Sequence, residues 1–546
     1  MKEIAMGPRA RKAFGEVTTR RWVVDSILDL TGYVPEADLA RRVIVEPAVG
    51  TGAFLGAIVE RLMSSAARWD RGAHELFGAL LAVDIRAENI EASRQVVRSV
   101  LSRWEVPPDL AAELARTWVR QGDFLLEELT HEADFVVGNP PYIRSDDLDD
   151  DIEKQYRDLW PTMRGRADIY VGFYEHGLGL LREGGKLGFI CADRWMRNAY
   201  GTRLRRLIAT RFCVEAVWLM HDVDAFEQEV SAYPAVTIIS RQPQASAVLV
   251  QTSSRFGPQG ARQARKFLGT DRSRGEGAGW SGARFPGWFG AETFWPAGEP
   301  ETIRVLERLR RQHPLLEADG RTRVGVGVAT GADRVFIVPR TAVPEVEEDR
   351  VLPLVMSKDI ATGSLETPDS LLLNPWDDQG KLVRIDDYPG LREALTSDNV
   401  VQDRYVARKN PAAWHRTIDK VHPGLAQRPK LLFQDMKSRI TPVLEPGGYY
   451  PHHNLYYVVS DAWDLEVLGG LLLSRVAESF ISTYGVRMRG GTLRFQAQYL
   501  RQIAVPDPDM MPADIQAKLR SAFRAQDRDL ATEAAEEAYG LPVGKI

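Results

Sequence analysis

Short β-branched apolar runs alternate with segments of helical spacing over residues 15–241 of this 546-residue chain. Strands that alternate with helices are typical of a parallel sheet covered by helices on both faces. The pattern therefore predicts an α/β domain. The predicted strands are residues 42–45, 79–83, 135–137, 187–191, 214–219 and 235–240, and the predicted helices are residues 20–30, 54–63, 85–101 and 201–210.

The character of the sequence changes after about residue 242. Residues 253–300 are rich in Gly, Arg and Ser, whose backbone preferences are too permissive to predict regular elements. An arginine-rich helical segment then leads into a second folded region, and the last residues are rich in Ala, Glu and Gln. We expect a first domain at residues 1–245, a linker or insertion at 246–300, a second domain at 301–510 and a helical segment at 511–546.

The composition is that of folded domains, because 44% of the residues are hydrophobic. It excludes collagen-like, wholly disordered and disulfide-stabilised classes. The two cysteines, Cys191 and Cys213, form no disulfide framework and favour a reducing compartment. The sequence shows no signal-peptide core and no stretch of about 20 uncharged apolar residues, so we expect a cytoplasmic protein with no membrane partner. A net charge of −5 argues against a generally basic nucleic-acid coat protein, although a local basic cleft is compatible with it.

A glycine-containing loop follows the first predicted strand, in the order Glu46-Pro-Ala48-Val-Gly50-Thr-Gly52. Glycines let the backbone turn tightly and approach a ligand at the carboxyl end of a strand, where open α/β sheets bind ligands. The loop is not the dinucleotide pattern, because Leu55 stands where the third glycine belongs. Any tight strand-to-helix turn would also use such glycines, so the loop alone leaves a purely structural role open.

Two acidic positions follow later strands. Asp84 ends the second predicted strand, directly before Ile85, and its carboxylate could accept hydrogen bonds from ribose hydroxyls. A helix N-cap is the alternative role. Asp123 could accept from an adenine amino group while Phe124 lies against the ring, although Asp123 taken singly is typical of a turn. Together with the glycine loop, these positions describe a pocket for an adenosine-containing cofactor better than any one of them does.

The sequence Asn139-Pro140-Pro141-Tyr142 follows the strand at 135–137. Two prolines remove backbone donors and fix φ, so the carbonyls there are held rigidly. The Asn139 side-chain oxygen and the Pro140 carbonyl can together accept both hydrogens of a planar amino group, which turns the nitrogen lone pair toward an electrophile. Tyr142 would stack on the ring that bears the amine. The alternative is an Asn-Pro turn with a buried tyrosine.

The order of these motifs resembles the gamma class of N6-adenine DNA methyltransferases, in the TaqI-like arrangement of type II restriction-modification systems. Residues 15–19 (GEVTT) match a segment that precedes the glycine loop in that class, which implies that Thr19 lies at the methionine part of S-adenosylmethionine. The other implied residues are the cofactor-binding Glu46, Ala48, Gly50, Gly52, Asp84, Ile85, Asp123, Phe124 and Asn139, the catalytic Asn139, Pro140 and Tyr142, and Phe226 as a second aromatic residue on the flipped adenine.

The resemblance implies a Rossmann-like class I S-adenosylmethionine-dependent methyltransferase domain with a mostly parallel seven-stranded sheet. Residues 327–331, 335–337, 471–474 and 489–491 resemble parts of an α+β target recognition domain. The implied reaction is direct methyl transfer to adenine N6 after base flipping, with S-adenosylmethionine as cofactor and no metal. Double-stranded DNA is the implied partner, a cognate restriction endonuclease a further one, and the chain is expected to be a monomer.

The sequence departs from the class in two places. The interval from Gly52 to Asp84 is long (84 − 52 = 32), and Phe226 lies among the acidic residues Glu227 and Glu229.

Basic residues of the second domain are candidates for contacts to phosphates or guanines, although each taken singly is more typical of solvated surface. They are Arg308, Arg310, Arg311, Arg404, Arg408, Lys409, Arg487, Arg489 and Arg494. We expect the acids at 146–151 and in the C-terminal tail to lie away from a basic cleft.

No ligand spacing joins His452 and His453 with His415 or His422, so no metal site is predicted. Cys191 is typical of a small core residue, and no nuclease motif is found.

Three other functions remain open on the sequence alone. The same Asn-Pro-Pro-Tyr motif can orient a glutamine amide of a protein substrate, but about 300 residues follow the catalytic part here. Methylation of RNA bases is a second alternative. A DNA-recognition subunit that has lost turnover is a third, and the intact Asn139 and glycine loop argue against it.

Overall fold

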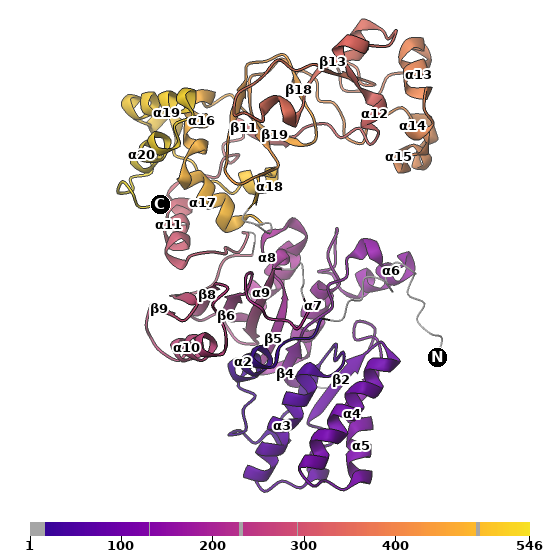
Figure 1. The fold of residues 1–546 in the computed structure, drawn as a ribbon, viewed down its shortest axis with the longest axis vertical. Helices are drawn as coiled ribbons and strands as arrows, with labels where there is room; N and C mark the ends of the chain where they lie inside the picture. Colours follow the sequence, from indigo (N-terminus) through magenta and orange to yellow (C-terminus); the bar gives the residue numbers. More distant parts are fainter. Residues whose placement is uncertain (1–16, 130–131, 229–232, 292, 487–491) are drawn as a thin grey trace. The chain divides into compact units, whose positions relative to one another are not determined.

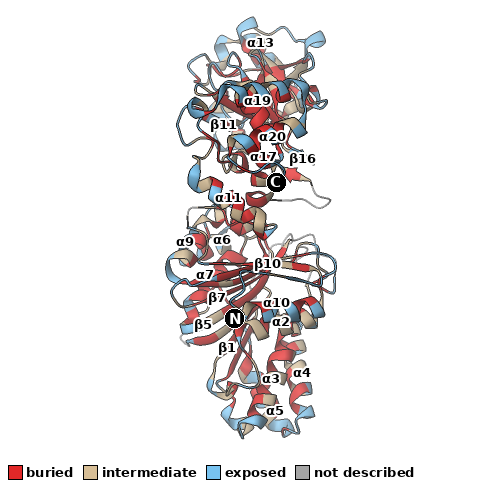
Figure 2. Ribbon diagram, turned by 90° about the vertical axis from the view of Figure 1, so that its left-hand side faces the viewer, coloured by how far each residue is buried: buried red, intermediate tan, exposed pale blue. Residues whose placement is uncertain are grey.

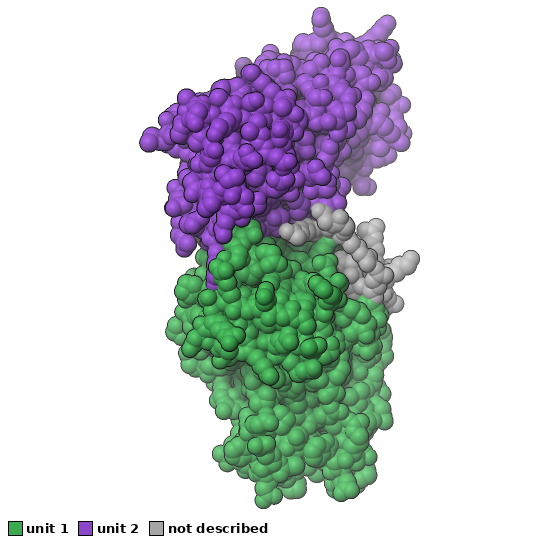
Figure 3. Space-filling model, turned by 60° about the vertical axis from the view of Figure 1, so that its left-hand side comes forward, with its two compact units in different colours: residues 1–303 green, residues 304–546 purple. Residues whose placement is uncertain are grey.

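A computed structural model describes residues 17–129, 132–228, 233–291, 293–486 and 492–546. The chain divides into two compact units, residues 1–303 and 304–546, which are described separately (Figure 3). No helix in these described ranges is both long enough and apolar enough to cross a membrane.

The first unit is built on a mixed sheet of ten strands in the order β3-β2-β1-β4-β5-β7-β6-β8-β10-β9 (Figure 1). Neighbours from β3 to β5 run parallel, whereas β7 is antiparallel to both β5 and β6. The strands are β1 Ile44–Glu46, β2 Leu80–Asp84, β3 Val119–Gln121, β4 Ala133–Gly138, β5 Leu181–Ala192, β6 Cys213–Leu219, β7 Pro234–Ser240, β8 Ala247–Thr252, β9 Arg274–Gly277 and β10 Trp280–Phe285.

Successive residues of the central strands belong to two different hydrophobic clusters. Ile44 lies in one cluster and Val45 in the other, and Val137 and Val136 divide in the same way. Because side chains alternate across a strand, the two clusters lie on opposite faces of the sheet. Helices α2, α3, α4, α5 and α10 contribute to the first cluster, and α6, α7 and α9 to the second. Figure 2 shows the central strands of the sheet mostly in the red of buried residues.

Helices α2, α3, α4 and α9 lie where the sequence pattern predicts helices, whereas α5, α6, α7 and α10 were not predicted. The mixed α/β character of the first unit is confirmed. The helices of the first unit are α2 Arg21–Thr31, α3 Ala53–Arg68, α4 Ala87–Arg103, α5 Pro108–Trp118, α6 Asp150–Leu159, α7 Tyr170–Leu180, α8 Arg194–Arg197, α9 Thr202–Arg211 and α10 Pro258–Leu268. Helix α11, Pro300–Gln312, begins in the first unit and lies mostly in the second.

Residues 246–300, predicted as a linker or insertion, form β8, α10, β9 and β10. Strand β8 pairs in parallel with β6, and β10 pairs antiparallel with both β8 and β9. The segment therefore extends the sheet beyond the seven strands that the resemblance implies.

In the described residues of the second unit, the strands form two four-stranded sheets and a pair of short strands. Its strands are β11 Thr322–Val326, β12 Ile337–Pro339, β13 Val351–Val355, β14 Ser370–Leu373, β15 Lys430–Gln434, β16 Met436–Lys437, β17 Val443–Glu445, β18 Tyr450–Pro451, β19 Leu455–Ser460 and β20 Leu493–Arg494. Its helices are α12 Asp333–Phe336, α13 Pro389–Thr396, α14 Val400–Asp403, α15 Tyr405–Lys409, α16 Leu465–Leu473, α17 Arg475–Tyr484, α18 Ala497–Leu500, α19 Ala513–Ala525 and α20 Arg528–Ala538.

The C-terminal residues pack within this second unit. Helices α19 and α20 contact each other and α16, whose sequence is almost entirely apolar. The segment at 511–546 therefore adds helices to this unit, which combines α and β elements.

Candidate active site

The glycine loop joins β1 to α3 at the carboxyl edge of the sheet. Gly50 and Gly52 have φ of +52° and +93°, a region that residues with a Cβ rarely adopt. A Cβ on Gly52 would also lie 3.3 Å from a methyl carbon of Val96. The loop backbone thus needs glycine for both its conformation and its packing.

Asp84, at the end of β2, is tied to this loop. Its Oδ2 accepts a hydrogen bond from the Gly50 amide at 2.9 Å, and its Oδ1 accepts from the Arg86 amide at 2.9 Å and the Asn89 side chain at 3.2 Å. Helix α4 begins at Ala87, with Arg86 at the N-cap position, so Asp84 is not the N-cap. The half-buried Ile85 follows, and its carbonyl accepts from the Gln121 side chain at 3.1 Å.

Glu46, the last residue of β1, is a buried carboxylate. Its side chain is 1% exposed, and Oε2 has no hydrogen-bond partner within the described part of the chain. Burial and the nearby Asp84 raise the pKa of this carboxyl well above its usual range. Buried polar atoms are normally paired, so Oε2 is available to a ligand donor.

Asn139 follows β4 and lies beside the glycine loop. A Cβ on Gly138 would be 3.6 Å from the Pro47 ring and 3.9 Å from Glu46 Cγ, so the ends of β1 and β4 are neighbours. The Asn139 amide nitrogen donates to the Val17 carbonyl at 3.2 Å. Because a carbonyl only accepts hydrogen bonds, the nitrogen must face Val17 and the side-chain oxygen is turned elsewhere. That Oδ1 is buried and finds no partner among the residues described.

Tyr142 completes the tetrapeptide. Its ring meets the Tyr170 ring edge to face at 6.3 Å between centroids. Its hydroxyl is buried with no hydrogen-bond partner in the described ranges, and burial raises its pKa well above the usual value. The Tyr142 ring thus packs against Tyr170, while its hydroxyl makes no hydrogen bond to a described residue.

Residues 17–20 connect Asn139 to Phe226. Thr19 and Phe226 form an isolated antiparallel bridge, and the Glu227 amide donates to the Thr18 carbonyl at 2.9 Å. Thr19 and Phe226 are 3% and 5% exposed, and Thr19 Oγ1 has no partner among described residues. Gly15, of the same motif, and residues 230–232 lie outside the described ranges.

Asp123 lies near the carboxyl edge of the sheet, whereas the Phe124 ring lies in the hydrophobic core. The Gly122 amide donates to the Asp84 carbonyl at 2.9 Å, which holds Asp123 near the same edge. Asp123 accepts from the Tyr156 hydroxyl at 2.6 Å and the Leu125 amide at 3.0 Å, and burial raises its pKa. Phe124 instead is 2% exposed, and its ring stacks on Phe173 and His176. The Phe124 ring therefore packs within the core, and its stacking on a ligand ring stays a prediction.

Two residues of this site are not predicted from the sequence. The Val17 carbonyl orients Asn139, and the Tyr156 hydroxyl binds Asp123. Val17 belongs to the GEVTT segment, which was a usable signal. Tyr156 lies in an acidic, mostly polar helix and carries no such signal.

Three of the basic candidates of the second unit make contacts within the protein. Arg404 is 9% exposed, and its guanidinium donates to the carbonyls of Thr330, Val401, Trp414 and Arg416, so it holds the fold together instead of meeting a phosphate. Arg494 makes two hydrogen bonds to Asp435, and Arg310 lies over the Tyr484 ring at 4.3 Å. The residues that remain exposed are Arg308, Arg311, Arg408 and Lys409. Arg487 and Arg489 lie outside the described ranges.

Cys191 lies in β5 and is 1% exposed. Burial raises the pKa of its thiol well above the usual value, which suits a core residue and not a nucleophile.

Several known proteins are similar to this chain. Residues 89–226 match the family described as Eco57I restriction-modification methylase. Type II methyltransferase M.PaeR7I of Pseudomonas aeruginosa is 41% identical over 97% of this chain and 92% of its own length, and M.XhoI of Xanthomonas vasicola is 39% identical over 96% and 97%. The structure of the type IIL restriction-modification enzyme MmeI in complex with DNA has a TM-score of 0.57 at 10% identity, covering 95% of this chain and 71% of that chain, which shows a likeness of fold.

Proposed function

We propose that this chain, which belongs to the type II methyltransferases of restriction-modification systems, methylates the N6 amino group of adenine in double-stranded DNA. The observation that carries this proposal is the Asn139 carboxamide, whose nitrogen is bound to Val17 and whose buried oxygen is left without a partner among the described residues. An acceptor held in this way can orient an amino group.

A class I S-adenosylmethionine-dependent fold is supported by the first seven strands of the sheet, from β3 to β6, in which only β7 runs antiparallel. The residues at its carboxyl edge fit the cofactor. Buried oxygen atoms of Thr19 and Glu46 lack partners in the described ranges, and the loop at Gly50 and Gly52 admits close approach of a ligand. When bound, S-adenosylmethionine supplies an electrophilic methyl group on its sulfonium sulfur.

Each residue at this edge has a proposed role in holding the cofactor. Glu46 and Thr19 offer their unpaired oxygens to its methionine part, the backbone at Ala48, Gly50 and Gly52 lets it approach closely, Asp84 and Ile85 border its ribose, and Asp123 borders its adenine. Phe124 supports the wall behind this pocket through its packing on Phe173 and His176.

Asn139 Oδ1 and the Pro140 carbonyl are proposed to accept the two hydrogens of the adenine amine. This arrangement directs the nitrogen lone pair at the methyl carbon. Bound S-adenosylmethionine would supply the methyl group to this nitrogen and keep its sulfur as a thioether, and the surplus proton of the amine would leave to solvent. No covalent enzyme intermediate is needed. Orientation of this kind can supply about 7–11 kcal/mol of the barrier reduction.

The adenine amine is paired inside duplex DNA, so the base must leave the helix, at a cost of a few kcal/mol. Tyr142 and Phe226 are proposed to hold the flipped base. Phe226 is bridged to Thr19, and Tyr142 directly follows the two prolines, so both aromatic residues flank Asn139 in the same part of the site. The chain is proposed to act as a monomer, protecting DNA from a cognate restriction endonuclease.

The proposed function is tested with the purified chain, labelled S-adenosylmethionine and genomic DNA that lacks adenine methylation. We expect label in DNA, and sequencing of modified bases should locate N6-methyladenine at one short recognition sequence. Parallel reactions contain total RNA or a protein extract. Label in RNA or in a protein glutamine, with none in DNA, would contradict the proposal, and absence of label from all three substrates would favour a catalytically silent recognition subunit.

Substitution of Tyr142 tests the stacking role. Tyr142→Ala should lower kcat/KM for DNA about 10- to 100-fold, because stacking of a base on an aromatic side chain is worth about 1–3 kcal/mol. Tyr142→Phe should change it by less than about threefold, because it keeps the stacking ring. The fluorescence of 2-aminopurine at the target base should rise with the wild type and the Phe variant. Equal kcat/KM for the Ala and Phe variants would rule out a stacking role.

A further inference from the structure

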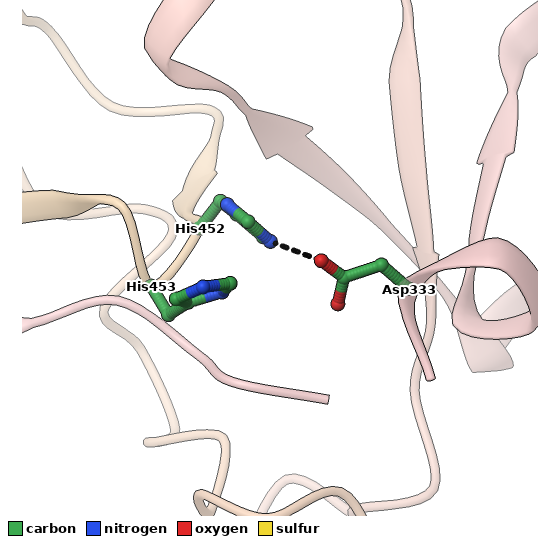
Figure 4. A group of neighbouring side chains, drawn as sticks. All are labelled: Asp333, His452 and His453. Atoms are coloured by element: carbon green, nitrogen blue, oxygen red, sulfur yellow. Dashed lines mark hydrogen bonds and ion pairs between the residues drawn. The ribbon is translucent and has the colours of Figure 1, made fainter. Parts of the chain in front are cut away.

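Asp333, His452 and His453 of the second unit lie together (Figure 4). One potential ligand atom of each residue lies within 4.8 Å of those of the other two. Among the described residues, these three are the ones of metal-binding type (His, Cys, Asp or Glu) that gather closely enough to hold an ion. Spacing along the sequence predicts no metal site here. The fold brings Asp333 to His452 across 119 positions, which a search for local ligand spacing does not detect.

The backbone holds the three residues in place. Asp333 is the first residue of α12, and the two histidines directly follow β18. The His452 amide donates to the Val355 carbonyl and the His453 amide donates to the Val328 carbonyl, both at 3.1 Å. The cluster is therefore formed where the segment after β11 passes the segment after β18.

The Asp333 carboxylate is oriented as an acceptor. Its Oδ1 accepts from the Thr330 hydroxyl at 2.5 Å, and its Oδ2 lies 3.1 Å from His452 Nε2. Thr330 is fully buried and its own oxygen accepts from the Ala332 amide at 3.0 Å, so the orienting hydroxyl is itself fixed.

The histidine rings have nitrogens that the described protein leaves unused. His452 is 1% exposed, and the Nδ1 atoms of His452 and His453 are buried with no partner in the described parts of the chain. Whichever nitrogen of neutral His452 carries the proton, one polar atom remains unsatisfied.

We propose that Asp333, His452 and His453 bind one zinc-class divalent cation. Two imidazoles and one carboxylate are ligands that Zn²⁺ prefers, whereas Mg²⁺ and Ca²⁺ select oxygen ligands. In a tetrahedral site with metal–ligand distances of about 2.0–2.1 Å, the ligand atoms lie about 3.4 Å from one another. Small rotations of the three side chains would bring their ligand atoms to that spacing. Water would take the fourth position. The ion would link the β11–α12 loop to the segment after β18.

The test uses the full chain without a histidine tag, because a tag would itself bind zinc. The chain is stripped with a chelator, dialysed against zinc chloride and then against metal-free buffer, and bound zinc is measured by elemental analysis. Cobalt chloride is used in a parallel sample, in which four-coordinate Co²⁺ gives strong visible absorption. The variants are His453→Gln and Asp333→Asn. His422→Gln, which changes an exposed histidine outside the cluster, is the matched control.

We expect about one zinc per chain in the wild type and in the His422→Gln control, as for a single three-ligand protein site. Zinc should raise the thermal unfolding temperature of both, and magnesium should not. His453→Gln and Asp333→Asn should lose the zinc, the cobalt absorption and the zinc-induced shift. Their circular dichroism and metal-free unfolding should match those of the metal-free wild type, which separates lost ligation from misfolding. No zinc in the wild type, or equal zinc in all variants, would overturn the proposal.

Discussion

Asn139→Ala is expected to lower kcat for methyl transfer about 10³-fold or more, equivalent to ~4 kcal/mol of transition-state stabilisation. In the proposed mechanism the side-chain oxygen is the acceptor that turns the adenine lone pair toward the methyl carbon, and alanine has no acceptor. Binding of S-adenosylmethionine, measured by calorimetry, should change by less than about threefold, because Glu46 and the glycine loop remain. Single-turnover kinetics with saturating DNA would measure the loss in the chemical step itself.

Two further variants sharpen this experiment. Asn139→Asp keeps an oxygen acceptor but loses the donor that binds the Val17 carbonyl, so it separates orientation by Val17 from the presence of an acceptor. It should retain more activity than the alanine variant but less than the wild type. Asn410→Ala changes an exposed asparagine of the second unit and serves as the control. If Asn139→Ala kept more than about a tenth of wild-type kcat, Asn139 would not orient the amine.

Glu46→Gln is expected to weaken binding of S-adenosylmethionine about 10- to 100-fold, because a hydrogen bond to a charged group is worth about 1.5–3 kcal/mol. The same substitution should stabilise the cofactor-free protein at alkaline pH. The wild-type protein holds this carboxyl in a site that is 1% exposed, where the charged form is disfavoured. Calorimetry with the cofactor and thermal unfolding without it measure the two effects separately.

The pH dependence of that second effect follows from the raised pKa of Glu46. A carboxyl whose pKa is higher in the folded state contributes stability that is fully present below its unfolded pKa and is lost as the pH rises through its folded pKa. Glutamine does not titrate. The gain in unfolding temperature of Glu46→Gln should therefore be present at pH above the folded pKa and disappear as the pH falls to the ordinary carboxyl range.

Glu128→Gln is the matched control, because Glu128 is exposed. It should leave both the affinity for the cofactor and the pH profile unchanged. Unchanged cofactor affinity in Glu46→Gln would remove Glu46 from the binding site, whereas a stability gain that is equal at all pH values would show that the charge of this carboxyl is not its cause.

The sequence predicted the parts of the site that depend on strand order. Glu46, Asp84 and Asn139 each follow an apolar run, and the carboxyl ends of parallel strands meet at one edge, so their proximity was predictable. Membership of the type II methyltransferases, which the motifs indicated, is confirmed by relatives that match almost the whole chain.

Side-chain directions were not predictable in the same way. The motif around Phe124 does not show whether its ring faces a ligand or the core. Arg404 is buried because four carbonyl groups from different positions of the fold accept hydrogen bonds from it, and the local sequence does not reveal them. The strands within residues 247–285 were not predicted, because glycine and arginine interrupt the apolar alternation that indicates a strand. These residues can still form strands at the edge of an existing sheet.

The short pairing of residues 17–20 with residues 225–228 has a consequence for synthesis on the ribosome. Thr18 and Gln228 are hydrogen-bonded although they are 210 positions apart. Since Val17 also orients Asn139, the carboxamide that we propose as catalytic receives its full support only after the chain has been translated beyond Gln228. Nascent chains released before that point would contain the complete tetrapeptide without the pairing that holds Phe226 beside Thr19. On the proposed mechanism, methyl transfer therefore requires that the first unit has been translated at least as far as Gln228.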